Sequence, residues 1–216
     1  LLIAAIALAA TACGDEGLVD SDSYLGFREQ PTACGAEQPP SAAKMVFDAP
    51  EDMGMGEPVR VRLETSCGDV VLTLDPAAAP VTVNSFVFLV EQGYYDGTVL
   101  HRVVPGFMVQ AGDPNAGEGG PPGYQLPDEL PPADYVYPPG ALAMANAGPN
   151  TAGSQFFIMV GEASLPPNYT VFGQVTSGFD AVVAMTRVQL GPNPAYRENS
   201  RPLETIYIER AEVLDG

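Results

Sequence analysis

The sequence contains few basic side chains and a single histidine. Its 216 residues carry 9 Lys and Arg against 27 Asp and Glu, a formal net charge of −18. Because binding to nucleic-acid phosphates or to anionic lipid headgroups needs clustered cations, we expect neither kind of partner. The one histidine, His101, cannot form a histidine metal cluster, and the three cysteines include no Cys-x-x-Cys pair. We therefore expect no metal ion and no other cofactor.

Several common catalytic and ligand-binding motifs are also missing. No serine lies in a Gly-x-Ser-x-Gly turn, and no lysine follows the glycine-rich segment 117–123. Asp113, Asn115 and Glu118 have the spacing of calcium ligands, but Tyr124 stands where the closing glutamate would fall. The sequence therefore predicts no serine hydrolase, phosphate loop or calcium loop.

The N-terminus has no apolar run long enough to cross a bilayer. Residues 1–12, LLIAAIALAATA, fall short of the roughly 20 residues that a spanning helix needs. They resemble the end of a secretory signal peptide whose start lies upstream, and Cys13 stands where bacterial lipoproteins carry an acylated cysteine. We therefore expect an extracytoplasmic protein of the cell envelope, held at the membrane only by a lipid on Cys13. Cleavage by an ordinary signal peptidase, without lipidation, is the alternative.

The segment 13–57 is acidic and contains prolines. Between Gly14 and Glu57, ten Asp or Glu accompany only two basic residues. Low hydrophobicity and net negative charge predict a tether rather than a domain, either a spacer from the membrane or a disordered leader. In an exported protein, Cys34 and Cys67 are an even pair that forms either a disulfide or two free thiols.

The globular domain, 58–216, begins with a β-hairpin. Residues 59–64 alternate apolar and charged side chains, residues 66–69 supply a turn, and residues 70–74 continue as a second strand. The hairpin indicates a domain that is at least partly β-sheet.

Two helices and several short strands follow the hairpin. Pro80 opens a helix that ends at Gly93, and a shorter helix is predicted over 179–186. The apolar residues of the first helix recur at i, i+3, i+4 and i+7, and these are Val83, Phe86, Val87 and Val90. Short apolar segments between Gly- or Pro-rich turns predict strands at 107–110, 140–145, 155–160, 171–175 and 205–213. Many short strands with two isolated helices favour a closed antiparallel barrel capped by those helices.

One cation is isolated in the middle of the domain. Arg102 lies in the stretch 98–113, TVLHRVVPGFMVQAGD, where it is followed by mostly apolar residues. Placing an unpaired charge among apolar groups is costly, so the arginine is either paired or used in function. A structural ion pair with Asp113 or Glu129 and a functional site are both consistent with this stretch alone.

A second stretch, 140–161, GALAMANAGPNTAGSQFFIMVG, presents an amide beside aromatic side chains. Strand alternation places Gln155, Phe157 and Met159 on one face, and Phe156, Ile158 and Val160 on the other. The first stretch likewise presents Met108 with Gln110. The two stretches together predict an apolar pocket with a few directional polar groups, which is typical of a small-ligand site.

Both stretches closely resemble the motifs of the cyclophilins, which are peptidyl-prolyl cis–trans isomerases, and order and spacing agree from about Pro58 to Leu214. The resemblance implies an all-β fold, a closed eight-stranded antiparallel barrel capped by two α-helices. It implies that Arg102 is the catalytic residue, with Gln110 and His101 in the same site. It also implies a proline pocket lined by Phe107, Met108, Phe157 and Leu165. The peptide-binding residues that it implies are Gln110, Ala145, Asn146, Ala147 and Gln155.

The sequence departs from the family pattern at three places. It has no Trp, and Ser164 stands where many members carry one before Leu165, so strong cyclosporin binding is not expected. Tyr169 stands where a histidine often lines the pocket, and Ala111 replaces a usual glycine. These changes affect the surroundings of the pocket and leave the residues of its centre in place.

The resemblance predicts an isomerase that acts on X-Pro bonds and assists the folding of extracytoplasmic proteins. Its partners would be proline-containing peptides and folding exported proteins, and we expect a monomer. A non-enzymatic module that binds proline-containing segments in the cell envelope is the main alternative. A structural envelope lipoprotein is a third, but it would leave the groove residues without a role.

Overall fold

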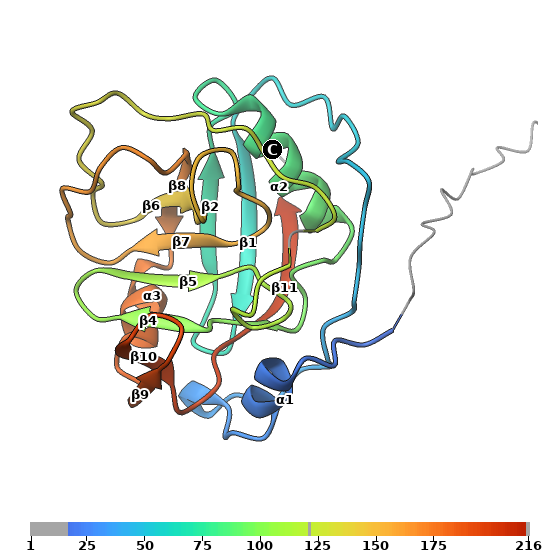
Figure 1. Ribbon diagram of the computed structural model, residues 1–216, viewed down its shortest axis with the longest axis vertical. Helices are drawn as coiled ribbons and strands as arrows, with labels where there is room; N and C mark the ends of the chain where they lie inside the picture. The colour runs from blue at the N-terminus through green and yellow to red at the C-terminus, as the bar shows by residue number, and fades with distance from the viewer. Residues whose placement is uncertain (1–16, 121, 215–216) are drawn as a thin grey trace, which may run out of the picture.

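A strongly curled antiparallel β-sheet forms the body of the molecule, with helices at its margins (Figure 1). The structure is a computed structural model that describes residues 17–120 and 122–214, so the apolar segment 1–12 and Cys13 lie outside the described residues. The sheet has nine strands in the order β3-β11-β1-β2-β8-β6-β7-β5-β4. Their bounds are β1 Val59–Thr65, β2 Val70–Leu74, β3 Thr98–Val99, β4 Arg102–Val104, β5 Met108–Ala111, β6 Ala141–Met144, β7 Phe156–Met159, β8 Val171–Ser177 and β11 Tyr207–Leu214.

One interrupted segment of chain links the two edges of the curled sheet. The two edge strands, β3 and β4, are consecutive in the sequence and are separated only by Leu100 and His101. β3 pairs with β11, whereas β4 pairs with β5 at the opposite end of the strand order. If β3 and β4 are counted as one interrupted strand, the sheet is the predicted eight-stranded antiparallel barrel. The prediction of the fold class is confirmed, although no continuous hydrogen-bond ladder closes the barrel.

The two predicted helices are present. α2, Pro80–Glu91, starts with proline, whose missing N–H is not needed in the first turn, and Gly93 follows it with φ of 68°. Its predicted apolar stripe is buried, and Phe86 lies 5.1 to 5.4 Å, centroid to centroid, from the rings of Tyr95, Phe156 and Phe172. α3, Phe179–Met185, matches the second predicted helix. α2 therefore contributes aromatic packing to the core.

Strand alternation divides the apolar side chains of β5 and β7 between two clusters. Phe156 and Ile158 belong to the main core, whereas Phe157 and Met159 belong to a separate outer cluster with Met108. This is the division predicted for β7 from the period of two. The outer cluster forms an apolar surface on the outside of the barrel wall.

Residues 17–57 pack along the domain and do not form the loose tether expected for 13–57 (Figure 1). A short helix, α1, Asp22–Arg28, buries Tyr24 and Phe27 completely. These aromatic residues are three apart and therefore share one helix face. The Tyr24 hydroxyl donates to the Gly97 carbonyl at 2.9 Å and accepts from the Ala42 amide at 2.7 Å. We call residues 17–57 the arm.

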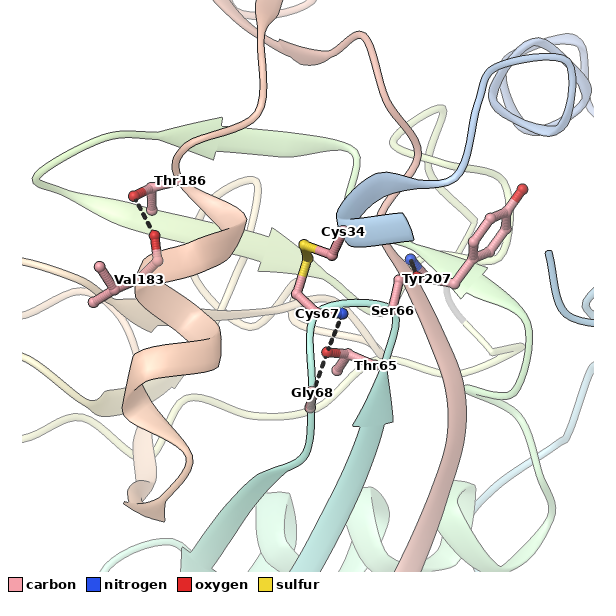
Figure 2. The surroundings of a disulfide bond; sticks show 8 residues. All are labelled: Cys34, Thr65, Ser66, Cys67, Gly68, Val183, Thr186 and Tyr207. Atoms are coloured by element: carbon pink, nitrogen blue, oxygen red, sulfur yellow. Dashed lines mark hydrogen bonds between the residues drawn. A yellow bond between two sulfur atoms is a disulfide. The ribbon is translucent and has the colours of Figure 1, made fainter. Parts of the chain in front are cut away.

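A disulfide joins the arm to the first hairpin (Figure 2). Cys34 lies in a 3₁₀ turn, η1, Ala33–Gly35, and Cys67 lies in the turn between β1 and β2, with 5.2 Å between their Cα atoms. Thr65 and Ser66 support this turn, since their hydroxyls accept hydrogen bonds from the amides of Cys67 and Tyr207. Of the two alternatives for the cysteine pair, the structure has the disulfide.

The remaining elements are a small second sheet and connecting loops. β9, Leu190–Asn193, and β10, Glu198–Pro202, form an antiparallel hairpin that lies beside β4 (Figure 1). Within residues 17–120 and 122–214, no helix has both the length and the apolar character needed to cross a membrane.

Candidate active site

Two adjoining cavities lie on the outer side of the barrel wall. The first has a volume of about 310 Å³ and is lined by Arg102, Phe107, Met108, Gln110, Ala145, Asn146, Phe157, Leu165, Tyr169 and Tyr196. Every lining residue except Tyr196 was predicted for the site. The second has a volume of about 330 Å³ and includes the predicted residues Ala147 and Gln155. The cavities share Gln110, Ala145, Asn146 and Tyr196, so together they form one groove.

The first cavity is an apolar pocket built on β5 and β7. Met108 and Phe157 are 2% and 6% exposed, respectively, although they lie on the outer face of the barrel. The Phe157 ring packs edge-on against Tyr169 with 5.4 Å between centroids. Phe107 and Leu165 complete the apolar walls. A small apolar ring would be removed from water on several sides in this pocket.

Arg102 brings a positive charge to the edge of this pocket. It pairs with Gln110 across β4 and β5, and its Nη1 donates to Gln110 Oε1 at 3.3 Å. Its Nε donates to Glu198 Oε1 at 2.7 Å, and the guanidinium carbon lies 4.1 Å from the centre of the Tyr196 ring. The arginine is therefore both a member of an ion pair and part of the cavity wall.

The two acids considered as partners of Arg102 bind elsewhere. The Glu129 carboxylate accepts from the amides of Val81 and Thr82 in the first turn of α2. Asp113 is fully buried and accepts from the backbone amides of a loop that it holds together. Arg102 does form an ion pair, which was one of the two alternatives, but its partner is neither suggested acid; it is Glu198, far away in the sequence.

A relay of side-chain hydrogen bonds connects Asp113 to Arg102. Gln155 Nε2 donates to Asp113 Oδ2 at 2.9 Å, and Gln110 Nε2 donates to Gln155 Oε1 at 2.9 Å. Since an ionised carboxylate only accepts, it selects the amino group of Gln155, and this choice fixes both amides in turn. The relay therefore leaves the Gln110 carbonyl oxygen facing Arg102.

Burial raises the pKa of Asp113, and the hydrogen bonds from Asn115, Gly119 and Gly117 partly oppose that rise. The same backbone contacts shape the loop over 113–119, and Gly119 lines the second cavity. Asp113 thus supports the groove from beneath.

The loop after β6 forms the opposite side of the groove. The Asn146 side chain is engaged within the protein, since its Nδ2 donates to the Asn168 carbonyl at 2.8 Å. The Ala145 amide donates to the Gln155 carbonyl at 2.9 Å, which ties the loop to the residue that precedes β7. Among the described residues, the backbone N–H and C=O of Asn146 make no hydrogen bond. These two backbone groups remain for an extended peptide.

His101 does not lie where the resemblance implied. It is 3% exposed and lines neither cavity, and its ring instead contacts Gly117, where a Cβ atom would come within 2.7 Å of the imidazole. Burial and, to a smaller extent, the positive charge of adjacent Arg102 together lower its pKa to about 4, with Gln155 partly opposing the shift. A neutral, enclosed imidazole packs beneath the site and has no access to a ligand in the groove.

Tyr196 and Glu198 are the site residues that sequence reasoning missed. Tyr196 lies in the turn between β9 and β10 and Glu198 is the first residue of β10, so both lie outside the two recognised stretches. The hydrogen bond from Arg102 lowers the pKa of Glu198. Nothing in the local pattern shows that this hairpin folds back over β4.

A groove with an apolar pocket, a guanidinium at its edge and open backbone groups beside it defines a site for an extended peptide that buries one apolar ring. Comparison with known proteins identifies the family. The family model described as cyclophilin type peptidyl-prolyl cis-trans isomerase/CLD matches residues 60–213. The chain belongs to this family, and it is a peptidyl-prolyl cis–trans isomerase.

Curated relatives and solved structures agree with this assignment. Peptidyl-prolyl cis-trans isomerase-like 1 from Gibberella zeae is 42% identical over 157 residues, covering 71% of this chain and 93% of the relative. Peptidyl-prolyl cis-trans isomerase B from Streptomyces anulatus is 40% identical over 177 residues, covering 74% and 98%. The crystal structure of a Cryptosporidium parvum cyclophilin type isomerase has a TM-score of 0.65 and 31% identity, covering 74% and 99%. A second structure of that protein, in the presence of the dipeptide Ala-Pro, has a TM-score of 0.63.

Proposed function

We propose that this isomerase turns X-Pro bonds in exported proteins, with Arg102 as the catalytic residue and the first cavity as the proline pocket. The observation that carries the role of Arg102 is its position, a guanidinium at the edge of an apolar pocket. Rotation about a peptide bond faces a barrier of about 18 to 20 kcal/mol, because resonance between the carbonyl and the nitrogen must be broken. An X-Pro bond therefore isomerises in tens to hundreds of seconds without catalysis.

The apolar pocket holds the proline ring while the bond turns. Phe107, Met108, Phe157 and Leu165 surround the ring, and burial from water supplies the binding energy. The open backbone groups of Asn146 bind the chain that precedes the proline. Holding one side of the bond restricts rotation to the other side, which places the twisted bond next to the same protein groups in every turnover.

Arg102 stabilises the twisted bond more than either planar form. As resonance is lost, the prolyl nitrogen regains its lone pair and becomes a hydrogen-bond acceptor. Among residues 17–120 and 122–214, Nη2 of Arg102 has no hydrogen-bond partner, so it can donate to this nitrogen. Only an interaction that strengthens in the transition state accelerates a reaction, and this donor meets that condition. No bond is made or broken, so no nucleophile is required.

Replacing Arg102 with alanine tests its role. Loss of one preorganised donor to a transition state costs about 10²- to 10³-fold in kcat. We expect a fall of at least about 100-fold in the isomerisation of an X-Pro peptide by Arg102→Ala, with an unchanged circular dichroism spectrum. Arg187→Ala is the matched control, because it removes the same charge from an exposed position at the end of α3. Normal turnover by Arg102→Ala would refute the assignment.

The proposed location rests on the cysteines. Disulfides persist in oxidising compartments, and the Cys34–Cys67 bridge fits a protein that folds outside the cytoplasm. Cys13 would carry the lipid, so the domain would act at the membrane on newly exported chains, as a monomer. Membrane fractionation of cells that express wild type and Cys13→Ser tests the anchor. Release of Cys13→Ser into the soluble fraction is expected, and equal membrane retention would contradict it.

A further inference from the structure

The β9–β10 hairpin places two side chains directly on Arg102. The Glu198 carboxylate accepts from Nε at 2.7 Å, and the Tyr196 ring lies under the plane of the guanidinium at 4.1 Å from its carbon. The Tyr196 hydroxyl is also 3.4 Å from Gln110 Nε2. The hairpin therefore contacts both polar groups at the edge of the proline pocket.

We propose that Tyr196 and Glu198 are positioning residues that hold the Arg102 guanidinium in the orientation needed for catalysis. The proposal rests on the proposed function of Arg102. It adds a third part of the chain to a site that the two central stretches otherwise supply.

Each residue around Arg102 contacts a different edge or face of the guanidinium. A guanidinium has five N–H donors in one plane, and its hydrogen-bonding edges determine which way the plane faces. Glu198 takes the Nε edge and Gln110 takes one hydrogen of Nη1, while Tyr196 covers one face. Within the described residues, the donors of Nη2 remain, and they belong to a side chain that lines the pocket. We call Tyr196 and Glu198 the clamp. By holding the guanidinium in this orientation, the clamp presents the remaining donors to the substrate.

The same contacts contribute little to folding. The side chain of Glu198 is 35% exposed and Tyr196 is 37% exposed, so removing either leaves no buried cavity. The hairpin is held independently, since the Arg201 guanidinium packs 4.1 Å from the Phe27 ring and the Leu203 amide donates to the Gln189 carbonyl at 2.9 Å. Variants at these two positions are therefore expected to fold, and their kinetics report on Arg102.

The test compares truncating and conservative variants in the full chain, with an X-Pro peptide as substrate. Because a small misplacement of a catalytic group is costly, Glu198→Ala and Tyr196→Ala are each expected to lower kcat/KM about tenfold, mainly through kcat. Glu198→Gln keeps an acceptor for Nε and Tyr196→Phe keeps the ring, so both should retain most activity. Asn199→Ala, an exposed change on the same hairpin, is the control and should match wild type.

A double-mutant cycle separates positioning from an independent role. If the clamp acts only through Arg102, adding Glu198→Ala or Tyr196→Ala to Arg102→Ala should cause no further loss. The NMR resonance of the Arg102 Nε–H should move in Glu198→Ala and stay in Asn199→Ala. Wild-type kinetics in both alanine variants, or losses that add fully to that of Arg102→Ala, would overturn the proposal. An inactive wild type, or an active Arg102→Ala, would instead overturn the proposed function and this inference with it.

Discussion

Removing the Cys34–Cys67 disulfide should weaken folding without changing the groove. The bridge joins positions 33 residues apart, and loop-closure entropy for a loop of this size corresponds to about 3 to 4 kcal/mol. The arm keeps other attachments in the variant, since Tyr24 and Phe27 stay buried under the barrel. The reduced protein should therefore remain folded at room temperature, with a lower free energy of unfolding.

Urea unfolding of wild type and of the double variant Cys34→Ser/Cys67→Ser measures this change, with Cys13→Ser in both proteins to exclude effects of the lipid. In thermal unfolding of the same proteins, a loss of about 3 to 4 kcal/mol would lower Tm by roughly 6 to 16 °C for a domain of this size. Reduction of the wild type with a thiol should give the same midpoint as the variant. The disulfide lines neither cavity, so kcat/KM below the unfolding transition should not change.

Equal urea midpoints for the oxidised wild type and the double variant would refute this reasoning. That result would mean that the buried aromatic residues of α1, rather than the covalent link, determine the stability of the arm. A smaller shift with a changed m-value would indicate that the variant releases the arm before the barrel unfolds.

Three other changes test the buried and apolar parts of the site. The pKa of His101 is about 6.5 in the unfolded chain and about 4 in the folded protein, so the unfolded chain takes up a proton first as the pH falls. Acidification from about pH 6.5 to about pH 4 should therefore remove about 3 kcal/mol of stability. Urea midpoints of His101→Gln should depend less on pH; equal slopes would contradict the lowered pKa. Gln155→Leu breaks the relay between Asp113 and Gln110 and should lower kcat/KM about tenfold, and unchanged kinetics would show that the relay does not orient Gln110. Leu165→Ala removes part of the pocket wall and should raise KM about tenfold with little change in kcat, whereas an unchanged KM would place the proline ring elsewhere.

Local patterns predicted the parts of the fold that depend on neighbours in sequence. The period of two in β1, β2 and β7, and the period of the α2 stripe, follow from the side of each element that is buried. The closure of the barrel came from the family resemblance, because strand order is a property of tertiary pairing. The sequence around Leu100 shows no local signal that the strand is interrupted between β3 and β4.

The arm and the clamp on Arg102 could not be predicted for two different reasons. The average composition of 13–57 is polar, and it conceals the few aromatic residues that anchor α1. Tyr196 and Glu198 reach Arg102 only because the β9–β10 hairpin lies beside β4, which no local spacing encodes. His101 was assigned to the site through the family resemblance, but it is adjacent to Arg102, and adjacent residues of an extended chain point to opposite sides.

The way in which the barrel closes has a consequence for association with other chains. Exposed strand edges can pair with foreign peptides and start aggregation. In the nine-stranded sheet, the two edge positions are occupied by β3 and β4, which have only two and three residues, respectively. Such short edges offer too few backbone groups to template another strand. Strand addition along these edges is therefore disfavoured, which leaves the proposed groove as the place where a proline-containing chain would bind.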